Sequence, residues 1–196
     1  MKTVTTLPEG YGEILTVDLQ KDKKLSLCIN LAALVMMAVL GTGMHFWIPI
    51  TTFFEFENGF WQAMLRPIIL LVSYVAYILL HEAVHGVAMK LCGSKKVKYG
   101  FTGPYAYAGS EDYYGKRAYL FIALAPVVLW GIVLGVLCVL VPRDWFWVVW
   151  FVQIGNLSGA VGDFYVTFKF LRMPREILVQ DSGVRMTVYV PHDEKE

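Results

Sequence analysis

The distribution of apolar residues divides the sequence into four long apolar segments that are joined by short polar stretches. The apolar segments cover residues 25–47, 67–91, 119–141 and 145–171. A helix needs about 20 apolar residues to cross a bilayer, and each segment reaches that length. The pattern therefore predicts an all-α polytopic membrane protein with four transmembrane helices.

The polar stretches predict short appendages rather than further domains. Residues 1–24 are an N-terminal segment, residues 25–171 a four-helix transmembrane domain, and residues 172–196 a polar C-terminal tail. The tail contains two short apolar runs that suggest a small hairpin of its own. We expect these appendages to lie outside the membrane.

A small β-hairpin is expected between the second and third apolar segments. Residues 97–101 and 105–109 are two short runs on either side of a turn that contains Gly103 and a proline. This pattern favours a hairpin, although a plain connecting loop fits it equally well. A hairpin here would offer a sheet edge to an extended substrate, and proline at Lys98 or Tyr107 would test that role.

The lysine and arginine residues predict which side of the membrane each end occupies. Four lie in the N-terminal segment, six between the second and third apolar segments, and five in the C-terminal part, whereas the opposite side carries only Arg66 and Arg143. Positively charged residues concentrate in cytoplasmic loops. We therefore expect a multi-pass protein of the cell membrane with both termini in the cytoplasm.

The composition supports a membrane protein and narrows the chemistry. Hydrophobic residues make up 57% of the chain and charged residues 17%, against roughly a quarter charged in soluble domains. A net charge of +1 gives no indication of nucleic-acid binding. The three cysteines, Cys28, Cys92 and Cys138, have no C-x-x-C spacing, which excludes a cysteine-based zinc site and a disulfide framework.

The second apolar segment contains the sequence His81-Glu82-Ala-Val-His85. Residues four apart on a helix share one face, so both imidazoles can reach one metal ion while Glu82 lies beside them as a base for a bound water. The plain alternative is a packed helix face with two buried histidines. An ionisable residue at membrane depth costs roughly 2.5 kcal/mol or more, and three within five residues therefore favour a functional site.

The fourth apolar segment contains the polar residues Asn156 and Asp163, which are seven apart and share a helix face. A buried carboxylate paired with a neighbouring helix is the plain alternative for Asp163, but no lysine or arginine lies at matching depth. We interpret Asp163 as a third metal ligand. Asn156 is a candidate for steadying the substrate or an oxyanion.

The depths of the two motifs agree. His81 and His85 follow Pro67 by 14 and 18 residues, or roughly 21–27 Å along a helix, and Asp163 follows Trp145 by a similar length. Both segments run from outside to inside in the predicted topology. The motifs therefore reach the same layer near the cytoplasmic face, where two histidines, one carboxylate and a water would form an open catalytic zinc site.

The motifs on these segments resemble those of known metalloproteases. An HEAVHG helix followed by a distant intramembrane Asp is similar to the site-2 protease class of intramembrane metalloproteases. A closer likeness, from about residue 67 to the tail, is to a family of small bacterial membrane proteins described as zincin peptidases. Its pattern is present as HEAVHG, as LAP at residues 124–126 and as NLSGAVGD at residues 156–163. Site-2 proteases usually have Asp-Gly where this chain has Gly162-Asp163.

The resemblance implies that His81, His85 and Asp163 hold Zn²⁺ and that Glu82 activates water. The sequence thus predicts a membrane-embedded zinc metalloprotease of the HExxH zincin type. Its partners would be the lipid bilayer and a membrane protein or peptide, cleaved near the cytoplasmic face. Two other classes stay open, namely a non-catalytic membrane protein that uses the metal structurally and a metalloenzyme that is not a peptidase.

Overall fold

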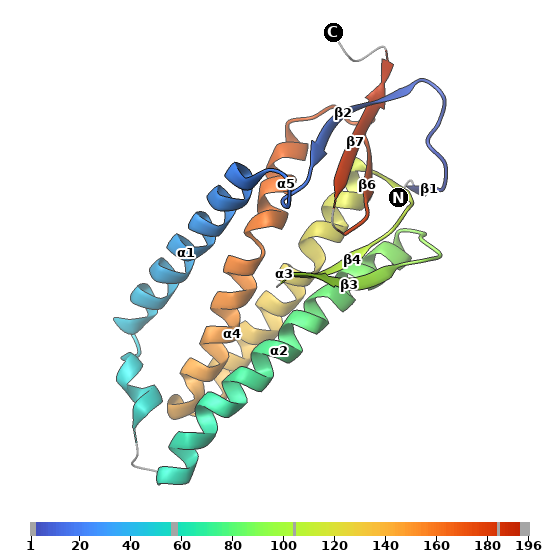
Figure 1. Ribbon diagram of the computed structural model, residues 1–196. Helices are drawn as coiled ribbons and strands as arrows, with labels where there is room; N and C mark the ends of the chain where they lie inside the picture. The colour runs from blue at the N-terminus through green and yellow to red at the C-terminus, as the bar shows by residue number, and fades with distance from the viewer. Residues whose placement is uncertain (1–2, 56–58, 104, 184, 193–196) are drawn as a thin grey trace. The chain divides into compact units, whose positions relative to one another are not determined.

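The computed structural model describes residues 3–55, 59–103, 105–183 and 185–192, and most of them are helical (Figure 1). The long helices are α1 (Lys23–His45), α2 (Phe60–Leu91) and α3 (Lys116–Leu140), and two shorter ones follow, α4 (Phe146–Gly159) and α5 (Val161–Leu171). Short 3₁₀ turns, η1 (Ile50–Phe54) and η2 (Arg143–Trp145), precede α2 and α4.

The chain forms two compact units. The first consists of Met1–Cys28, Glu82–Pro126 and Gly162–Glu196, and the second of Ile29–His81 and Val127–Val161. Helices α1, α2 and α3 each contribute residues to both units.

The first unit contains an antiparallel sheet built largely from the two ends of the chain. Its strand order is β1-β5-β6-β7-β2, as Figure 1 shows in part. The strands are β1 (Thr3–Val4), β2 (Tyr11–Val17), β5 (Tyr113–Gly115), β6 (Leu178–Asp181) and β7 (Met186–Pro191). This corrects the prediction of an all-α protein with polar tails, because both tails supply strands.

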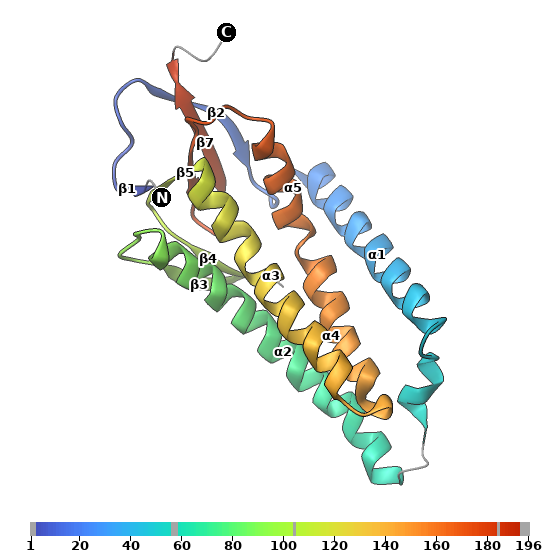
Figure 2. The same ribbon diagram turned by 180° about the vertical axis from the view of Figure 1, so that it is seen from behind.

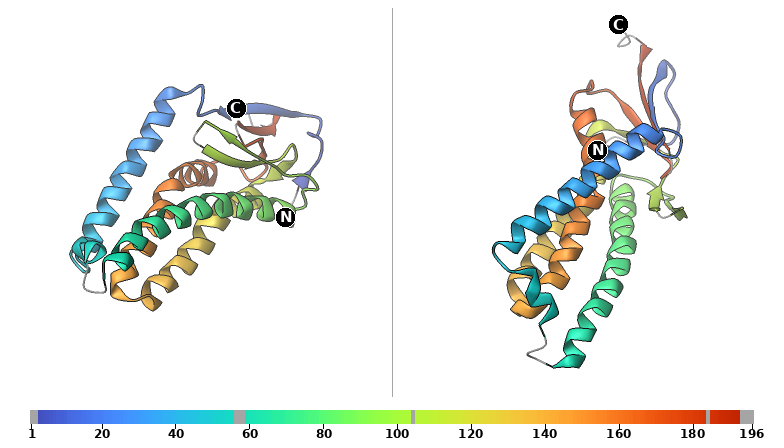
Figure 3. Two further views of the ribbon diagram at one scale, coloured as in Figure 1. Left: turned by 60° about the horizontal axis from the view of Figure 1, so that its bottom comes forward. Right: turned by 60° about the vertical axis from the view of Figure 1, so that its left-hand side comes forward.

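A separate two-stranded sheet consists of β3 (Lys98–Thr102) and β4 (Tyr105–Gly109) (Figure 3). Lys98 pairs with Gly109 and Thr102 with Tyr105, so the two strands are antiparallel neighbours along their whole length. Gly103 has φ +58°, a left-handed conformation that favours glycine. The hairpin predicted between the second and third apolar segments is confirmed.

The core of the first unit joins the sheet to the helices. Ala88 and Met89 of α2 meet Ile122 of α3 and Phe170 of α5, and the sheet contributes Val179 and Val188. Each such fully buried large apolar side chain stabilises the fold by about 1.5–3 kcal/mol. This packing holds the end of α2 against α3, α5 and the sheet.

The second unit contains a buried arginine. Arg66 of α2 is 1% exposed, and its Nη1 donates hydrogen bonds to the carbonyls of Thr52, Phe53 and Glu55 at 2.9–3.1 Å. Its Nη2 pairs with Asp144 at 3.0 Å. Arg66 therefore ties η1 to η2, whereas the sequence pattern had indicated only a charge at the outer membrane surface.

Three helices of the described residues are long and apolar enough to span a membrane, namely Lys23–His45, Ala63–Leu91 and Lys116–Leu140. The fourth predicted segment is divided at Ala160 into α4 and α5 (Figure 2). The Ser158 hydroxyl donates to the Ile154 carbonyl one turn back, a bond that often bends helices, and Gly155, Gly159 and Gly162 weaken the helix there. Four spans therefore stay a prediction.

Candidate metal centre

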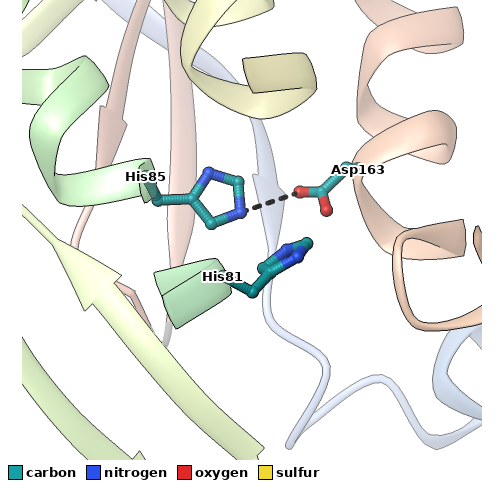
Figure 4. Close-up of side chains that lie close together, drawn as sticks. All are labelled: His81, His85 and Asp163. Atoms are coloured by element: carbon teal, nitrogen blue, oxygen red, sulfur yellow. Dashed lines mark ion pairs between the residues drawn. The ribbon is translucent and has the colours of Figure 1, made fainter. Parts of the chain in front are cut away.

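The candidate centre contains His85 on α2 and Asp163 in the first turn of α5. The His85 Nε2 lies 3.7 Å from Asp163 Oδ1 (Figure 4). Both side chains are partly buried, at 12% and 24% exposed. The two predicted ligands from the second and fourth apolar segments are thus brought together.

The other nitrogen of His85 is held by the protein backbone. Its Nδ1 lies 2.9 Å from the carbonyl oxygen of Ile122. A carbonyl can only accept a hydrogen bond, so Nδ1 carries a proton. A ring with its proton on Nδ1 alone presents a lone pair at Nε2 toward the Asp163 carboxylate, which leaves both acceptors available to one cation.

His81 lies one helical turn before His85 and is 8% exposed. Its Nδ1 is 2.8 Å from the hydroxyl oxygen of Tyr77, four residues earlier on α2. One ligand atom from each of His81, His85 and Asp163 lies within 4.8 Å of the others, and Figure 4 shows the three side chains. The structure therefore places these three predicted ligands in one cluster.

Glu82 follows His81 on α2 and meets the hairpin. The backbone N–H of Ala108, in strand β4, hydrogen-bonds the Glu82 carboxyl group. Two close contacts, each at a glycine, hold the hairpin in place. Gly86 leaves no room for a Cβ beneath the Tyr99 ring, and Gly109 leaves none against the backbone of Ser182. The position of β4 beside the candidate base thus depends on these glycines.

Asn156 is buried and hydrogen-bonds to three neighbouring residues. It is 0% exposed. Its Nδ2 donates to the Val127 carbonyl at 3.2 Å and to Gln153 Oε1 at 3.3 Å, and its Oδ1 accepts from the Tyr77 hydroxyl at 3.0 Å. A role in steadying substrate or an oxyanion stays a prediction, but the geometry connects Asn156 to His81 through Tyr77.

A further carboxylate near the centre, besides Asp163 and Glu82, was not singled out from the sequence. Asp181, at the end of β6, interacts electrostatically with His85, Glu82 and Asp163. Burial raises its pKa, while the Tyr119 hydroxyl and the Gly183 N–H donate hydrogen bonds that favour its charged form. Its only sequence signal is a local Asp-Ser-Gly turn, which says nothing about the distant helices.

The donor set fits a zinc ion. Two imidazoles and one carboxylate with an open fourth position are typical of catalytic zinc sites. Two ligands at about 2.1 Å from zinc and at a tetrahedral angle lie about 3.4 Å apart, close to the 3.7 Å between His85 and Asp163. Hydrogen bonds at both Nδ1 atoms match the usual support of ligating histidines.

Comparison with known proteins places the chain in a family. A family described as "Putative zincin peptidase" matches residues 74–178, more than half of the chain. The chain belongs to this family. The matched region contains His81, His85 and Asp163 as well as Glu82, and a zincin family implies zinc as the metal.

The chain was also compared with individual proteins and with solved structures. The chain is 27% identical over 122 residues to a protein of Pyrococcus woesei named "Uncharacterized 24.7 kDa protein in gap 5'region", and the match covers 60% of this chain. The chain spans about half the length of that relative, with 53% covered. No solved structure matches the chain.

Proposed function

We propose that the protein is a membrane-embedded zinc metalloprotease that cleaves membrane-associated proteins or peptides near the cytoplasmic face. The observation that carries the proposal is the clustering of His81, His85 and Asp163 within 4.8 Å, with Glu82 next in sequence to one ligand. A zinc ion held by these three ligands would polarise a scissile carbonyl and lower the pKa of a water molecule.

Glu82 supplies the proton transfers of this mechanism. Its carboxylate takes a proton from the attacking water and passes it to the departing amine, a role that typically contributes 10²–10⁴-fold to the rate. The Ala108 N–H holds one side of the carboxyl group. That bond supports Glu82 as an oriented base, and strand β4 would then lie next to the bond to be cleaved.

Metal content tests the proposal most directly. We expect the purified wild type to bind about one zinc per chain and to hydrolyse peptide substrates in a reaction that stops on chelation and resumes on zinc addition. His85→Ala should lose the metal, because it removes one of three ligands. Metal analysis beside a hydrolysis assay measures both. A wild type prepared without chelators that never takes up a divalent metal would contradict the proposal.

The membrane location rests on the apolar helices. Three of them can span a bilayer, and α1 buries none of its residues within the protein, as expected for a helix that faces lipid. The concentration of lysine and arginine in the tails and in the connection between α2 and α3 supports cytoplasmic termini.

Reporter fusions test this topology. Fusions after residue 24, after residue 105 and at the C-terminus should report a cytoplasmic location, and one after Glu55 an external location. These expected locations follow from the unequal distribution of lysine and arginine between the two sides. An external signal after residue 105 would contradict the orientation and would separate the centre from the cytoplasmic face.

The pairing of the hairpin indicates which edge is open to a substrate strand. Thr102 pairs with Tyr105, and the pair that flanks a two-residue connection in a hairpin is normally the hydrogen-bonded one, so bonded pairs are expected to alternate along the strands from there. Ala106 and Ala108 of β4 therefore point their N–H and C=O groups away from β3. The Ala108 bond to Glu82 agrees with this alternation and places the outer edge of β4 at the candidate base.

Proline substitutions test β4 as the substrate edge. Ala106→Pro removes an outward N–H from β4, and we expect peptide cleavage to fall about 10-fold or more while zinc content stays unchanged. Its paired residue Phe101 points its N–H outward from β3, so Phe101→Pro is the matched control. Proline at Lys98 or Tyr107 is less informative, because both residues lie in pairs that bond across the hairpin. Equal activity of Ala106→Pro and the wild type would exclude β4 as the edge.

A further inference from the structure

We infer that helix α3 determines which nitrogen of each ligand histidine carries the proton, through Pro126 for His85 and through Asn156 and Tyr77 for His81. These three residues are therefore positioning residues. The inference rests on the proposed zinc site and assigns it a supporting structure. It also gives Asn156 a role different from direct substrate contact.

Pro126 explains why a helix carbonyl is available to His85. In an α-helix the carbonyl of residue 122 normally accepts a hydrogen bond from the N–H of residue 126. Proline has no N–H, so Pro126 leaves the Ile122 carbonyl without this bond although α3 continues through it. The His85 Nδ1 occupies that carbonyl at 2.9 Å. The Leu-Ala-Pro sequence thus acquires a function in orienting a metal ligand.

Two other backbone carbonyls of α3 determine the direction of the hydrogen bonds that lead to His81. Gln153 Nε2 donates to the Gly131 carbonyl at 3.2 Å, which leaves Gln153 Oε1 as an acceptor. Asn156 Nδ2 donates to that oxygen and to the Val127 carbonyl. Turning either amide over would bring oxygen against a carbonyl oxygen, so both orientations are determined.

The orientation of Asn156 determines the direction of the hydrogen bonds that lead through Tyr77 to His81. Because its Nδ2 is the donor, Asn156 Oδ1 must face Tyr77, and the Tyr77 hydroxyl donates its single proton there at 3.0 Å. The hydroxyl oxygen then accepts from His81 Nδ1–H at 2.8 Å. His81 is thereby held with its proton on Nδ1 and a lone pair on Nε2, as His85 is.

The consequence is a pair of imidazoles prepared for the metal before it arrives. A neutral histidine with the proton on Nε2 would have to exchange it before ligating through that atom. Supporting bonds of this kind typically change metal affinity by 10–100-fold when removed. A residue that contacts only the oxyanion would instead change the rate and leave metal affinity intact.

Tyr77→Phe tests the branch that leads to His81. We expect zinc affinity to fall by about 10–100-fold, and ¹⁵N spectra of the metal-free protein to show His81 losing its uniform Nδ1–H form. Asn156→Leu should have the same two effects. Tyr114→Phe is the matched control, because Tyr114 is also buried and its hydroxyl bonds the Ser94 hydroxyl rather than a histidine; it should match the wild type.

Pro126→Ala tests the hydrogen bond that orients His85. We expect the variant to bind zinc more weakly although it is more stable to heat. Alanine restores the N–H that competes for the Ile122 carbonyl, so zinc affinity should fall by roughly 10-fold while the thermal midpoint rises, since proline disfavours a helix interior. Pro67→Ala, which also replaces a proline inside a helix, is the control and should leave zinc affinity unchanged.

The outcomes separate this inference from the proposed function. A wild type that binds no zinc refutes the proposed function. A wild type that binds zinc, with Tyr77→Phe, Asn156→Leu and Pro126→Ala each folded and binding zinc as tightly, overturns the inference alone. An Asn156→Leu variant that loses rate but keeps zinc affinity overturns it as well, and supports direct substrate contact by Asn156.

Discussion

Replacing Glu82 by glutamine should reduce peptide hydrolysis by about 10²–10⁴-fold, the usual contribution of a general base, while the zinc content stays at the wild-type level. The glutamine side chain has the same size and keeps an oxygen that can accept the Ala108 N–H. It cannot take a proton from water, however. The variant therefore removes the proposed chemistry while leaving the hairpin and the three ligands in place.

Hydrolysis rates and metal content of Glu82→Gln and the wild type, measured on the same preparations, check this prediction. Substrates trapped by the variant in membranes can be identified by mass spectrometry and then used in the assay. Unchanged turnover in Glu82→Gln would show that another group is the base. Loss of zinc together with activity would assign Glu82 to the metal rather than to proton transfer, as in a structural site.

Replacing Arg66 by leucine should cause the largest loss of stability. The change leaves three carbonyls and the Asp144 carboxylate without the guanidinium that they share. Removing one partner of a buried ion pair costs about 3–5 kcal/mol. Since Asp144 is 16% exposed and partly hydrated, we expect about 3 kcal/mol, which lowers the thermal midpoint by roughly 6–12 °C for a chain of this size.

Thermal unfolding in detergent measures the effect, with Arg143→Leu as the control. Arg143 is exposed and adjacent to Asp144 in the sequence, so its replacement removes the same charge and should shift the midpoint little. A double variant with Asp144→Leu should be more stable than Arg66→Leu alone, because the carboxylate that has lost the Arg66 guanidinium is removed too. Equal midpoints for Arg66→Leu and Arg143→Leu would refute the structural role of Arg66.

The parts of the centre that could be predicted from sequence are those with a local pattern. His81, Glu82 and His85 follow from helical spacing, and Asp163 from its depth in an apolar segment; the structure brings the three ligands into one cluster. The hairpin also follows from two short runs around a turn. Each of these predictions uses only residues that are close together in the sequence, or the number of residues between a motif and the start of its apolar segment.

The parts that could not be predicted depend on partners far away in the sequence. Strands β1 and β5 are two and three residues long, too short for a period-two pattern, and they pair across more than a hundred residues. The burial of Arg66 depends on backbone carbonyls, which every sequence has. Asp181 approaches the centre only because its strand β6 pairs with β5 and β7.

The break between α4 and α5 has a different cause. The apolar run over residues 145–171 contains no proline and has the composition of a single span. Small residues and a serine that bonds its own helix favour the interruption at Ala160. Hydropathy reports transfer into lipid and is insensitive to such local backbone competition, so length alone predicted one continuous helix.

The pairing of β2 with β7 has a consequence for how the protein is made. Val17 pairs with Met186, so β2 leaves the ribosome long before its partner exists. At ordinary synthesis rates the delay is on the order of 10–30 s. The turn between β6 and β7, against which Gly109 packs, also forms last. The strand beside Glu82 therefore gains its final support only when most of the chain has been made, and translation itself delays the assembly of the candidate centre.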